Sequence, residues 1–265
     1  MSETLARTLL IACLALPAHA APAAPPYAQS SVPSRARLPP LRIAMDQNYP
    51  PYSSRNAQGE LEGYTVDLWR LWQQKTGRAV ELVPANWAQV QPMLESGRAD
   101  VIDPIVQTPA RLARFDFSPP YGAVSTGIYA EASIGGIHDM GSLRGFEVGV
   151  QQGDACAEQL ARAGVRHVRV FPSYDTLMAA AARRELKLLC LDENSADYHL
   201  YRLGLHRSYV QAFEVTRDPF RRAVRKGDAA TLALVERGMA QISAAEREAL
   251  RDKWMGRPLV PTRYT

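Results

Sequence analysis

The sequence is poor in cysteine, with three among 265 residues, and it contains no long block of basic residues. The formal net charge is +4, but the lysines and arginines are scattered among acids. Nucleic-acid-binding surfaces cluster their basic residues, so this distribution argues against a nucleic-acid partner. Beyond residues 1–20, no stretch approaches the roughly 18 consecutive apolar residues of a membrane-spanning helix, and we expect no such helix there.

Histidine and cysteine form no arrangement typical of a metal site. The five histidines show no ligand spacing, and there is no second cysteine pair that could complete a zinc site. We therefore expect no bound metal and no cofactor.

Residues 1–20 are laid out as a secretory signal peptide. Arg7 precedes the apolar run 9–16, and the small-x-small sequence at 18–20 is a cleavage site. Residues 21–37 are rich in Ala, Pro and Ser without an apolar period, and they predict an extended tether. We therefore expect an exported protein that resides in the periplasm.

The cysteine count depends on that cleavage. An alternative interpretation takes Cys13 as the end of a lipoprotein box, but Arg7 lies too close to it and the apolar run continues past it. Removal of the signal peptide leaves Cys156 and Cys190, an even pair in an oxidising compartment. From the residues alone they are either a disulfide or two buried thiols.

From residue 41 onward, short strand-like segments alternate with amphipathic helical ones. Segments 41–45 and 79–83 flank a helix in which Trp69 and Trp72 recur at helical spacing, and Gly77 is a plausible C-terminal cap. This is one strand–helix–strand unit. We expect both tryptophans to belong to the core.

A second helix and strand follow in residues 88–103, where Pro92 is tolerated only in the first turn of the helix. The alternating pattern then restarts near residue 130. Such alternation predicts largely parallel sheets in α/β layers. Two such units joined by extended segments predict two lobes with a cleft between them, where α/β proteins tend to bind ligands.

The last third of the chain predicts two strands and two helices. Segments 208–215 and 220–227 are strand-like, and the second of them is a candidate for the return to the first lobe. Asp228 is expected to cap one helix, and the capping box formed by Ser243 and Glu246 opens the other.

Five motifs follow one another in a familiar order through residues 41–256: "LRIAMDQNYPPYSSRNAQGELEGYTVDL", "ESGRADVID", "TPARLARFDFSPPY", "LRGFEVGVQQGD" and "ISAAEREALRDKWMG". The chain resembles the type II periplasmic solute-binding proteins of the amino-acid-binding family, also called venus-flytrap domains. The resemblance implies two α/β lobes joined by two hinge strands around a ligand cleft. Lobe 1 would combine 38–128 with 215–258, lobe 2 would be 129–214, and 259–265 would form a short tail.

The resemblance also implies ligand contacts. In amino-acid-binding members the arginine after a Thr-containing turn binds the ligand α-carboxylate, and Arg111 occupies that place. Its planar guanidinium offers paired donors and stays charged. Thr108 would cap the helix start with Pro109 in the first turn, aiming Arg111 into the cleft. The acid that takes the ligand ammonium would be Asp192.

Three further residues match positions around the ligand side chain. Trp87 matches an aromatic that stacks over it, Tyr49 matches a second wall, and Asp46 lies where members selective for basic side chains keep an acid. Tyr49 and Trp87 can alternatively be lobe core, and Asp46 can cap a strand end. We expect Arg114 to face solvent or to pair with Asp116.

The sequence departs from transport-type members at two points. They carry small hydroxyl residues before the arginine, where this chain has Asp103 and Pro104, and Asp154 stands where hydroxyl donors are common. These features resemble the sensor modules that head membrane histidine kinases and cyclic di-GMP enzymes. Cys156 and Cys190 also recur together in that group, so the resemblance favours a disulfide.

The expected cleft places four acids against Arg111, namely Asp46, Asp103, Asp154 and Asp192. Clustered acids repel one another unless a cation joins them. One acid suffices for an α-ammonium group, so the surplus favours a basic amino acid, arginine first and lysine or ornithine after it.

We therefore expect a non-catalytic periplasmic sensing domain that binds an amino acid and signals by closure to a membrane-bound module. The last segment, "RPLVPTRYT", stands where such a receptor would enter its membrane helix. One alternative is a free substrate-binding protein that passes ligand to the permease of an ABC importer. Another is a periplasmic dehydratase of the cyclohexadienyl dehydratase type, with Glu193 or Asp154 as general acid.

Overall fold

The computed structural model of the protein describes residues 38–256. The predicted signal peptide (1–20), the tether (21–37), Cys13 and the tail (259–265) lie outside the described residues.

The described chain begins with the larger part of one lobe and then crosses into the second. The first elements are β1 (Leu41–Asp46), β2 (Asn48–Tyr49), β3 (Ser53–Arg55), β4 (Leu61–Glu62), α1 (Tyr64–Thr76), β5 (Val80–Ala85), α2 (Trp87–Glu95), β6 (Val101–Val106), α3 (Pro109–Leu112) and β7 (Phe115–Phe117). Then follow β8 (Gly122–Glu131), η1 (Gly141–Leu143), β9 (Val148–Gln151), α4 (Ala155–Arg162), β10 (Val168–Phe171), α5 (Tyr174–Ala182), β11 (Leu188–Asp192) and α6 (Glu193–Arg202). The chain returns through β12 (Tyr209–Arg225) to α7 (Ala229–Met239) and α8 (Ala244–Met255).

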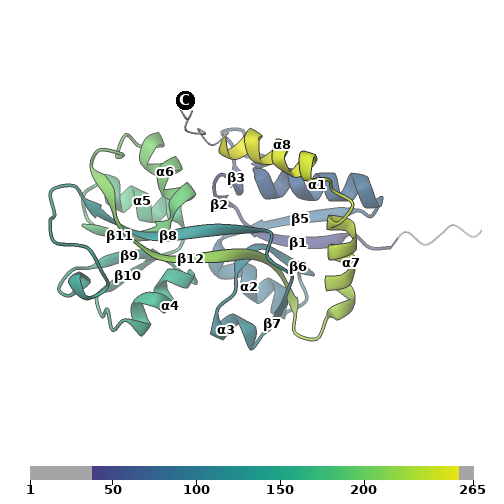
Figure 1. The fold of residues 1–265 in the computed structure, drawn as a ribbon, viewed down its shortest axis with the longest axis horizontal. Helices are drawn as coiled ribbons and strands as arrows, with labels where there is room; N and C mark the ends of the chain where they lie inside the picture. Colours follow the sequence, from purple (N-terminus) through teal and green to yellow (C-terminus); the bar gives the residue numbers. More distant parts are fainter. Residues whose placement is uncertain (1–37, 257–265) are drawn as a thin grey trace, which may run out of the picture. The chain divides into compact units, whose positions relative to one another are not determined.

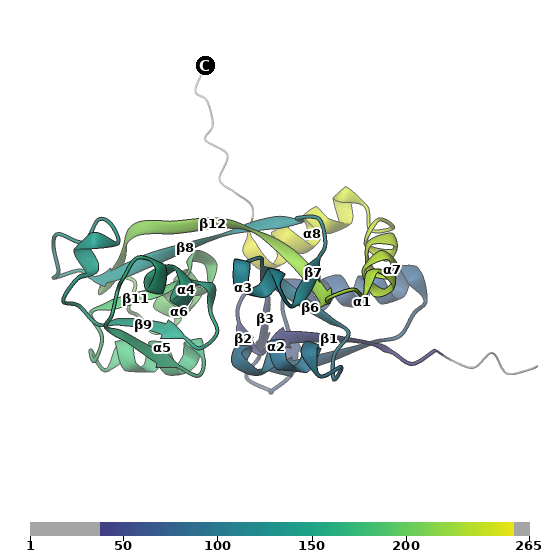
Figure 2. The ribbon, with the colours of Figure 1, turned by 90° about the horizontal axis from the view of Figure 1, so that it is seen from below.

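One sheet runs through both lobes in the order β10-β9-β11-β8-β12-β6-β1-β5, with β7 paired to β12. In lobe 1, β1 pairs parallel with β5 and β6, and in lobe 2, β9 pairs parallel with β10 and β11. Between these parallel parts, β8 and β12 pair antiparallel with each other. Figures 1 and 2 both show these two long strands running side by side from one lobe to the other. This is the two-lobed α/β fold with two hinge strands that the sequence predicts.

The predicted lobe limits fall inside the crossing strands, because 128/129 lies in β8 and 214/215 lies in β12. The strands predicted at 208–215 and 220–227 are one continuous strand, so the predicted break between them is wrong. β12 instead continues through residues 216–219, and its pairing register with the neighbouring strands shifts at several points, the last of them between Arg221 and Ala223.

Local signals explain most helix ends. Gly63 precedes α1 with a φ of 135°, and a Cβ on it would stand 2.2 Å from the carbonyl oxygen of Tyr52. Gly77 ends the same helix in the left-handed conformation, as predicted. The capping box of Ser243 and Glu246 is present at the start of α8.

Pro92 does not sit in a first helical turn, as the sequence analysis required. The helix α2 begins at Trp87, one residue after its N-cap Asn86, so Pro92 lies in the helix interior. A proline there removes the main-chain bond to the carbonyl four residues earlier. The cost is confined to the end of the helix, which stops at Glu95.

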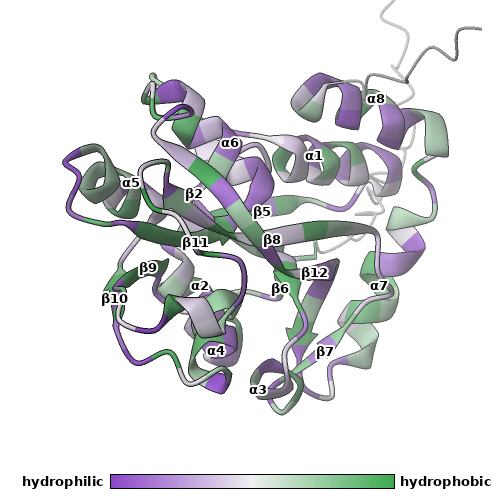
Figure 3. Ribbon diagram, turned by 60° about the vertical axis from the view of Figure 1, so that its left-hand side comes forward, coloured by the Kyte–Doolittle hydropathy of each residue, from purple (hydrophilic) through white to green (hydrophobic). Residues whose placement is uncertain are grey.

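The largest apolar cluster contains buried residues of both lobes, from Ile43 of lobe 1 to Leu189 of lobe 2. Trp69 and Trp72 are fully buried in lobe 1, as predicted. Cys156 and Cys190 belong to a separate apolar cluster in lobe 2. Figure 3 shows β9 and β11 hydrophobic along most of their length, whereas the visible side of α8 is largely hydrophilic. The sheet therefore supplies much of the buried apolar surface.

Candidate ligand cleft

A cavity lies between the lobes, at the carboxyl ends of β1 and β6 on one side and of β9 and β11 on the other. Six of the eight predicted ligand-binding residues line it: Asp46, Tyr49, Trp87, Arg111, Asp154 and Asp192. Ligands of α/β proteins bind at such strand ends, because the loops and helix starts that follow converge there.

Arg111 is aimed by the start of α3. The Thr108 hydroxyl accepts the main-chain N–H of Arg111 at 3.3 Å, and Pro109 occupies the first helical position. The guanidinium is buried; its Nη1 donates to the carbonyl of Val106 at 2.8 Å and its Nη2 to that of Gly153 at 2.9 Å. Burial lowers the pKa of Arg111. Its Nε finds no acceptor within the described chain, so the group keeps donors for a ligand carboxylate.

Asp192 ends β11 and faces two hydroxyl donors. Tyr49 donates to its Oδ2 and Thr126 to its Oδ1, each at 2.5 Å. Burial, followed by the charge of Asp154, raises the pKa of Asp192 to about 7. The carboxylate is thus held in place but poorly solvated, which suits it to accept a cation.

Asp46 ends β1 on the opposite wall. Its Oδ2 accepts from the Gln151 side chain at 2.8 Å, and its Oδ1 accepts from the main-chain N–H of Asn48 at 2.9 Å. Burial raises the pKa of Asp46 to about 6. Because Gln151 belongs to lobe 2, this hydrogen bond also joins the two lobes.

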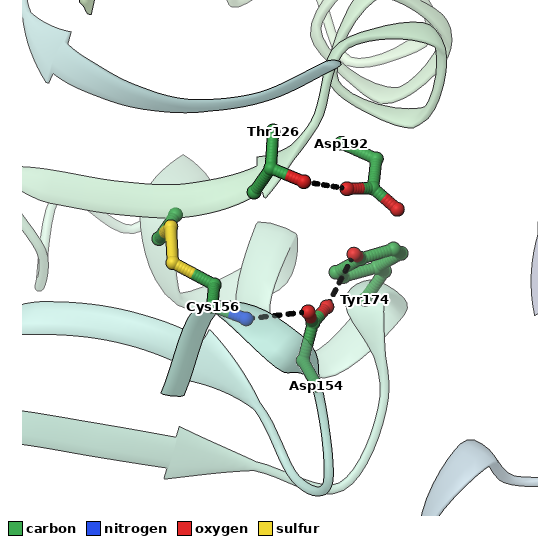
Figure 4. The surroundings of a disulfide bond; sticks show 6 residues. Thr126, Asp154, Cys156, Tyr174 and Asp192 are labelled. Atoms are coloured by element: carbon green, nitrogen blue, oxygen red, sulfur yellow. Dashed lines mark hydrogen bonds between the residues drawn. A yellow bond between two sulfur atoms is a disulfide. The ribbon is translucent and has the colours of Figure 1, made fainter. Parts of the chain in front are cut away.

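Asp154 is the N-cap of α4. Its Oδ1 accepts from the main-chain N–H of Cys156 at 3.0 Å, and its Oδ2 accepts from the Tyr174 hydroxyl at 2.7 Å (Figure 4). Cys156 and Cys190 are disulfide-bonded, with 6.4 Å between their Cα atoms. Cavity and disulfide therefore lie at the same end of lobe 2.

Two predicted ligand contacts lie away from the cavity. Asp103 is fully buried in lobe 1, where it accepts from the indole of Trp69 at 2.8 Å, from Arg222 at 3.2 Å and from the Tyr121 hydroxyl. The placement of Asp103 in the cleft is therefore wrong, because a buried cation and two further donors draw its side chain into the lobe.

Thr108 is the second of these residues. Its hydroxyl accepts the N–H of Arg111 and donates to Glu158 across the lobes at 3.1 Å. Thr108 thus caps α3 as predicted, but the structure does not place it among the residues that line the cavity.

Arg114 is exposed to solvent, which is one of the two predicted alternatives, and it is not paired with Asp116. Its guanidinium donates to Glu95 at 2.8 Å and to Gln91 at 2.6 Å, and it lies over the ring of Phe115. Asp116 pairs instead with a lysine on the turn before α7. Arg114 is thus a support for α2.

Sequence reasoning missed several residues of the cavity wall. Gln151 is the last residue of β9 and Tyr174 lies just after the end of β10, so the rule that ligands bind at carboxyl ends of strands could have found them. Thr126 and Phe220 come from the crossing strands β8 and β12. No local sequence signal distinguishes those two positions.

Other contacts also close the cleft. The Trp87 indole donates to the carbonyl of Gly153 at 2.8 Å, and the Ser195 hydroxyl donates to the carbonyl of Pro50 at 2.8 Å.

In residues 38–256, no helix is long and apolar enough to cross a membrane. The same residues hold no group of three or more side chains suited to a metal ion.

A two-lobed α/β fold with charged groups converging on the cleft defines a periplasmic-type amino-acid-binding domain. The chain belongs to the bacterial extracellular solute-binding proteins, family 3, which match residues 41–257.

Relatives of the chain are binding proteins and a sensor. The L-cystine-binding protein TcyJ of Escherichia coli (strain K12) is 29% identical over 226 residues, covering 82% of this chain and 82% of TcyJ. A histidine kinase sensor domain with similarity to periplasmic binding proteins has a TM-score of 0.78 and 27% identity, covering 84% of this chain and 98% of that chain. An ancestral arginine-binding protein bound to arginine has a TM-score of 0.76 at 23% identity, covering 82% and 98%, and shares the fold.

Proposed function

We propose that this domain captures a basic amino acid, arginine first and lysine or ornithine after it, and signals to a membrane-bound output module when the cleft closes. The observation that supports a basic ligand is the excess of negative charge in the cavity between the lobes. Three carboxylates, those of Asp46, Asp154 and Asp192, line the cavity that Arg111 also lines.

The charges favour a ligand with an additional cation. Arg111 pairs with the ligand α-carboxylate, and one acid pairs with the α-ammonium group. A neutral side chain would leave two carboxylates of the cavity without a cation, at least one of them buried, which is costly. A guanidinium or ammonium side chain supplies the missing positive charge.

The raised pKa values of two of these acids support the same ligand class. Burial raises the pKa of Asp46 to about 6, and burial together with Asp154 raises that of Asp192 to about 7. A nearby cation favours the ionised form of a carboxyl group. A basic ligand and the ionised site therefore stabilise each other.

The aromatic wall suits the stem of such a ligand. Tyr49 and Trp87 line the cavity, and Tyr49 is stacked on Tyr52 with 4.9 Å between ring centroids. The alkyl stem of a basic side chain packs on such rings, and its charged end interacts favourably with an aromatic face.

L-Cystine is a second candidate, because TcyJ is named for it. Cystine carries two carboxylates and two ammonium groups. A second carboxylate would call for a second cation, whereas Arg111 is the one cationic side chain among the described residues that line the cavity. The charge distribution therefore favours a basic amino acid over cystine.

Calorimetry of the purified, ligand-stripped protein tests the proposal. We expect heat of binding with L-arginine, L-lysine or L-ornithine, and none after the Arg111→Ala substitution. Heat with L-cystine, L-glutamine or L-glutamate and none with the three basic amino acids would contradict it. Product formation from prephenate or arogenate would favour the dehydratase alternative instead.

The likeness to a histidine kinase sensor domain supports a signalling role over import. Hinge closure around a ligand changes the relation of the two lobes, and such a change can be read by an attached module. In cells that lack this protein, we expect uptake of radiolabelled arginine to continue at the normal rate. A loss of uptake would favour the free binding protein of an ABC importer.

A further inference from the structure

The disulfide of lobe 2 connects the two elements that carry the acids of that lobe. Cys156 follows the N-cap Asp154 by two residues in α4, and Cys190 precedes Asp192 by two residues in β11. Figure 4 shows the disulfide beside both carboxylates, with Tyr174 between them. The covalent link thus joins the main chain close to each of the two charges.

The local geometry links the position of each cysteine to the position of the nearby carboxylate. Residues two apart on a strand point to the same face, so Cys190 and Asp192 share one side of β11. On the other side of the link, the N–H of Cys156 itself donates to Asp154. Fixing the two cysteines therefore fixes the relative positions of Asp154 and Asp192.

The two acids need such a constraint because they repel each other. The charge of Asp154 is the second largest cause, after burial, of the raised pKa of Asp192. α4 is otherwise held by apolar packing through Leu160 and by two hydrogen bonds, from Thr108 to Glu158 and from Tyr174 to Asp154. Apolar packing is non-directional and a single hydrogen bond is weak, so the covalent link is the strongest constraint on the start of this helix.

We propose that the disulfide between Cys156 and Cys190 is a positioning bond of the ligand cleft, which holds Asp154 and Asp192 together as a pair that accepts the cationic part of the ligand. The identity of that ligand rests on the proposed function, but the positioning does not. Both cysteines are fully buried, so we assign the bond a geometric role in the folded protein.

A ligand-free experiment tests the positioning directly. The double variant Cys156→Ala, Cys190→Ala removes the link and leaves both acids in place. Carbon-13 NMR of labelled aspartate carboxyl groups reports their pKa values, and Asp192→Asn and Asp154→Asn assign the signals. The groups facing Asp192 are Tyr49, Thr126 and Tyr174 with their hydroxyls, Asp154, and the guanidinium of Arg111.

In the wild-type protein, we expect Asp192 to titrate near pH 7 and Asp154→Asn to lower its pKa. The cysteine variant should lower the pKa of Asp192 in the same direction, because the acids move apart. If Asp154→Asn lowers it and the cysteine variant leaves it unchanged, the acids stay paired without the bond and the proposal is wrong. If neither variant lowers it, the two acids do not interact and the proposal is also wrong.

Leu143→Ala is the matched control for lost stability. Leu143 is buried in the same apolar cluster but lies on η1, so its truncation leaves the side chains of α4 and β11 intact. Both the control and the cysteine variant should lower Tm by roughly 5 to 15 °C. Only the cysteine variant should change the titration of Asp192.

Ligand affinity provides a second measurement with the amino acid that the wild-type protein binds. Measured well below Tm, Kd should rise roughly 10- to 100-fold in the cysteine variant and stay within about twofold in Leu143→Ala. Equal Kd values in the cysteine variant and the wild type would contradict the role in binding. If the wild-type protein instead binds a neutral amino acid, the proposed ligand class is wrong, but the NMR titration still tests the positioning of the two acids.

Discussion

The indole N–H of Trp87 in lobe 1 donates to the main-chain carbonyl of Gly153 in lobe 2 at 2.8 Å. Arg111 donates to the same oxygen at 2.9 Å. The side chain of Gln91 donates to it as well, at 3.4 Å. One carbonyl of lobe 2 therefore receives three side chains of lobe 1, of which Trp87 and Arg111 also line the cavity. Closing the cleft and forming its ligand-binding walls are thus the same structural event.

Trp87→Phe should weaken ligand binding while keeping the aromatic wall. The variant loses one hydrogen bond between the lobes, of about 0.5 to 1.5 kcal/mol, so Kd should rise roughly 2- to 12-fold. Calorimetry measures this change. Trp254→Phe is the matched control, since it removes an indole donor to Asp67, at the contact between α8 and α1. Identical Kd values for Trp87→Phe and the wild type would show that the contact does not contribute to closure.

Arg111→Lys should lower affinity by roughly 100-fold or more. Lysine keeps the charge but cannot present two parallel donors to a carboxylate. The carbonyls of Val106 and Gly153 would also lose the hydrogen bonds that the guanidinium donates to them. Titration calorimetry with the wild-type ligand provides the measurement. An affinity within about threefold of the wild type would exclude bidentate recognition by this residue.

Asp46→Asn should change which side chain is accepted. The amide oxygen can still accept from the main-chain N–H of Asn48, and the NH2 group can donate to the Gln151 side chain once that amide turns over, so the wall keeps its shape but loses its charge. Affinity for basic amino acids should fall relative to that for glutamine, measured as a ratio of Kd values. Asp192→Asn serves as the comparison and should weaken all amino acids alike. An unchanged ratio in Asp46→Asn would remove Asp46 from the specificity site.

The ligand-free protein should gain stability from Asp192 as the pH falls. Its folded pKa is about 7, whereas an unperturbed Asp titrates near 3.9, so between these values the folded state binds the proton more readily. Relative to Asp192→Asn, the wild type should have its lowest Tm near pH 8 and gain through pH 7 toward pH 5. His199, with its pKa lowered by burial to about 4, acts in the opposite direction but is common to both proteins.

Ligand affinity should respond to pH in the opposite sense. A cationic ligand requires ionised Asp192, so affinity for a basic amino acid should fall as the pH drops from about 8 to about 5. Calorimetry across this range gives the profile. Affinity that rises toward pH 5 would be incompatible with recognition of an ammonium group by this carboxylate.

The buried ion pair of lobe 1 should be costly to break from one side. Arg222→Met leaves Asp103 as a buried carboxylate without its cation, so the free energy of unfolding should fall by about 3 to 5 kcal/mol. Adding Asp103→Asn removes the charge, keeps an oxygen that accepts from Trp69, and places an NH2 group that can donate to the Tyr121 hydroxyl. The double variant should therefore be more stable than Arg222→Met alone in urea denaturation. If the changes in the free energy of unfolding caused by the two substitutions simply add, the two groups are not coupled.

Local signals in the sequence predicted many of the helix ends and several of the residues that line the cavity. The cap of Asp228 and the left-handed Gly77 depend on neighbours within a few residues, and such signals can be read directly. The arginine of the cleft follows the same logic, because Thr108 and Pro109 begin the helix that aims it. Strand ends place Asp46 and Asp192 on opposite walls of one cavity.

What the sequence could not predict depends on distant partners. Asp103 turns into lobe 1 because Arg222 lies opposite it. The residues around Asp103 in the sequence give no sign of an ion-pair partner 119 residues later. Phe220 reaches the cavity only because β12 continues through a stretch that includes Pro219, where sequence propensity predicts a break. Long-range charge pairing and irregular strand pairing determined both outcomes.

The pairing of β8 with β12 has a mechanical consequence. The two strands stay hydrogen-bonded from Tyr209 to Phe220 of β12, with register shifts between Gln211 and Phe213 and between Glu214 and Thr216. Opening the cleft must therefore flex a two-stranded ribbon, and the irregular positions are where it yields most easily. We therefore expect the stiffness of this ribbon to contribute to the free energy of opening and closing the cleft.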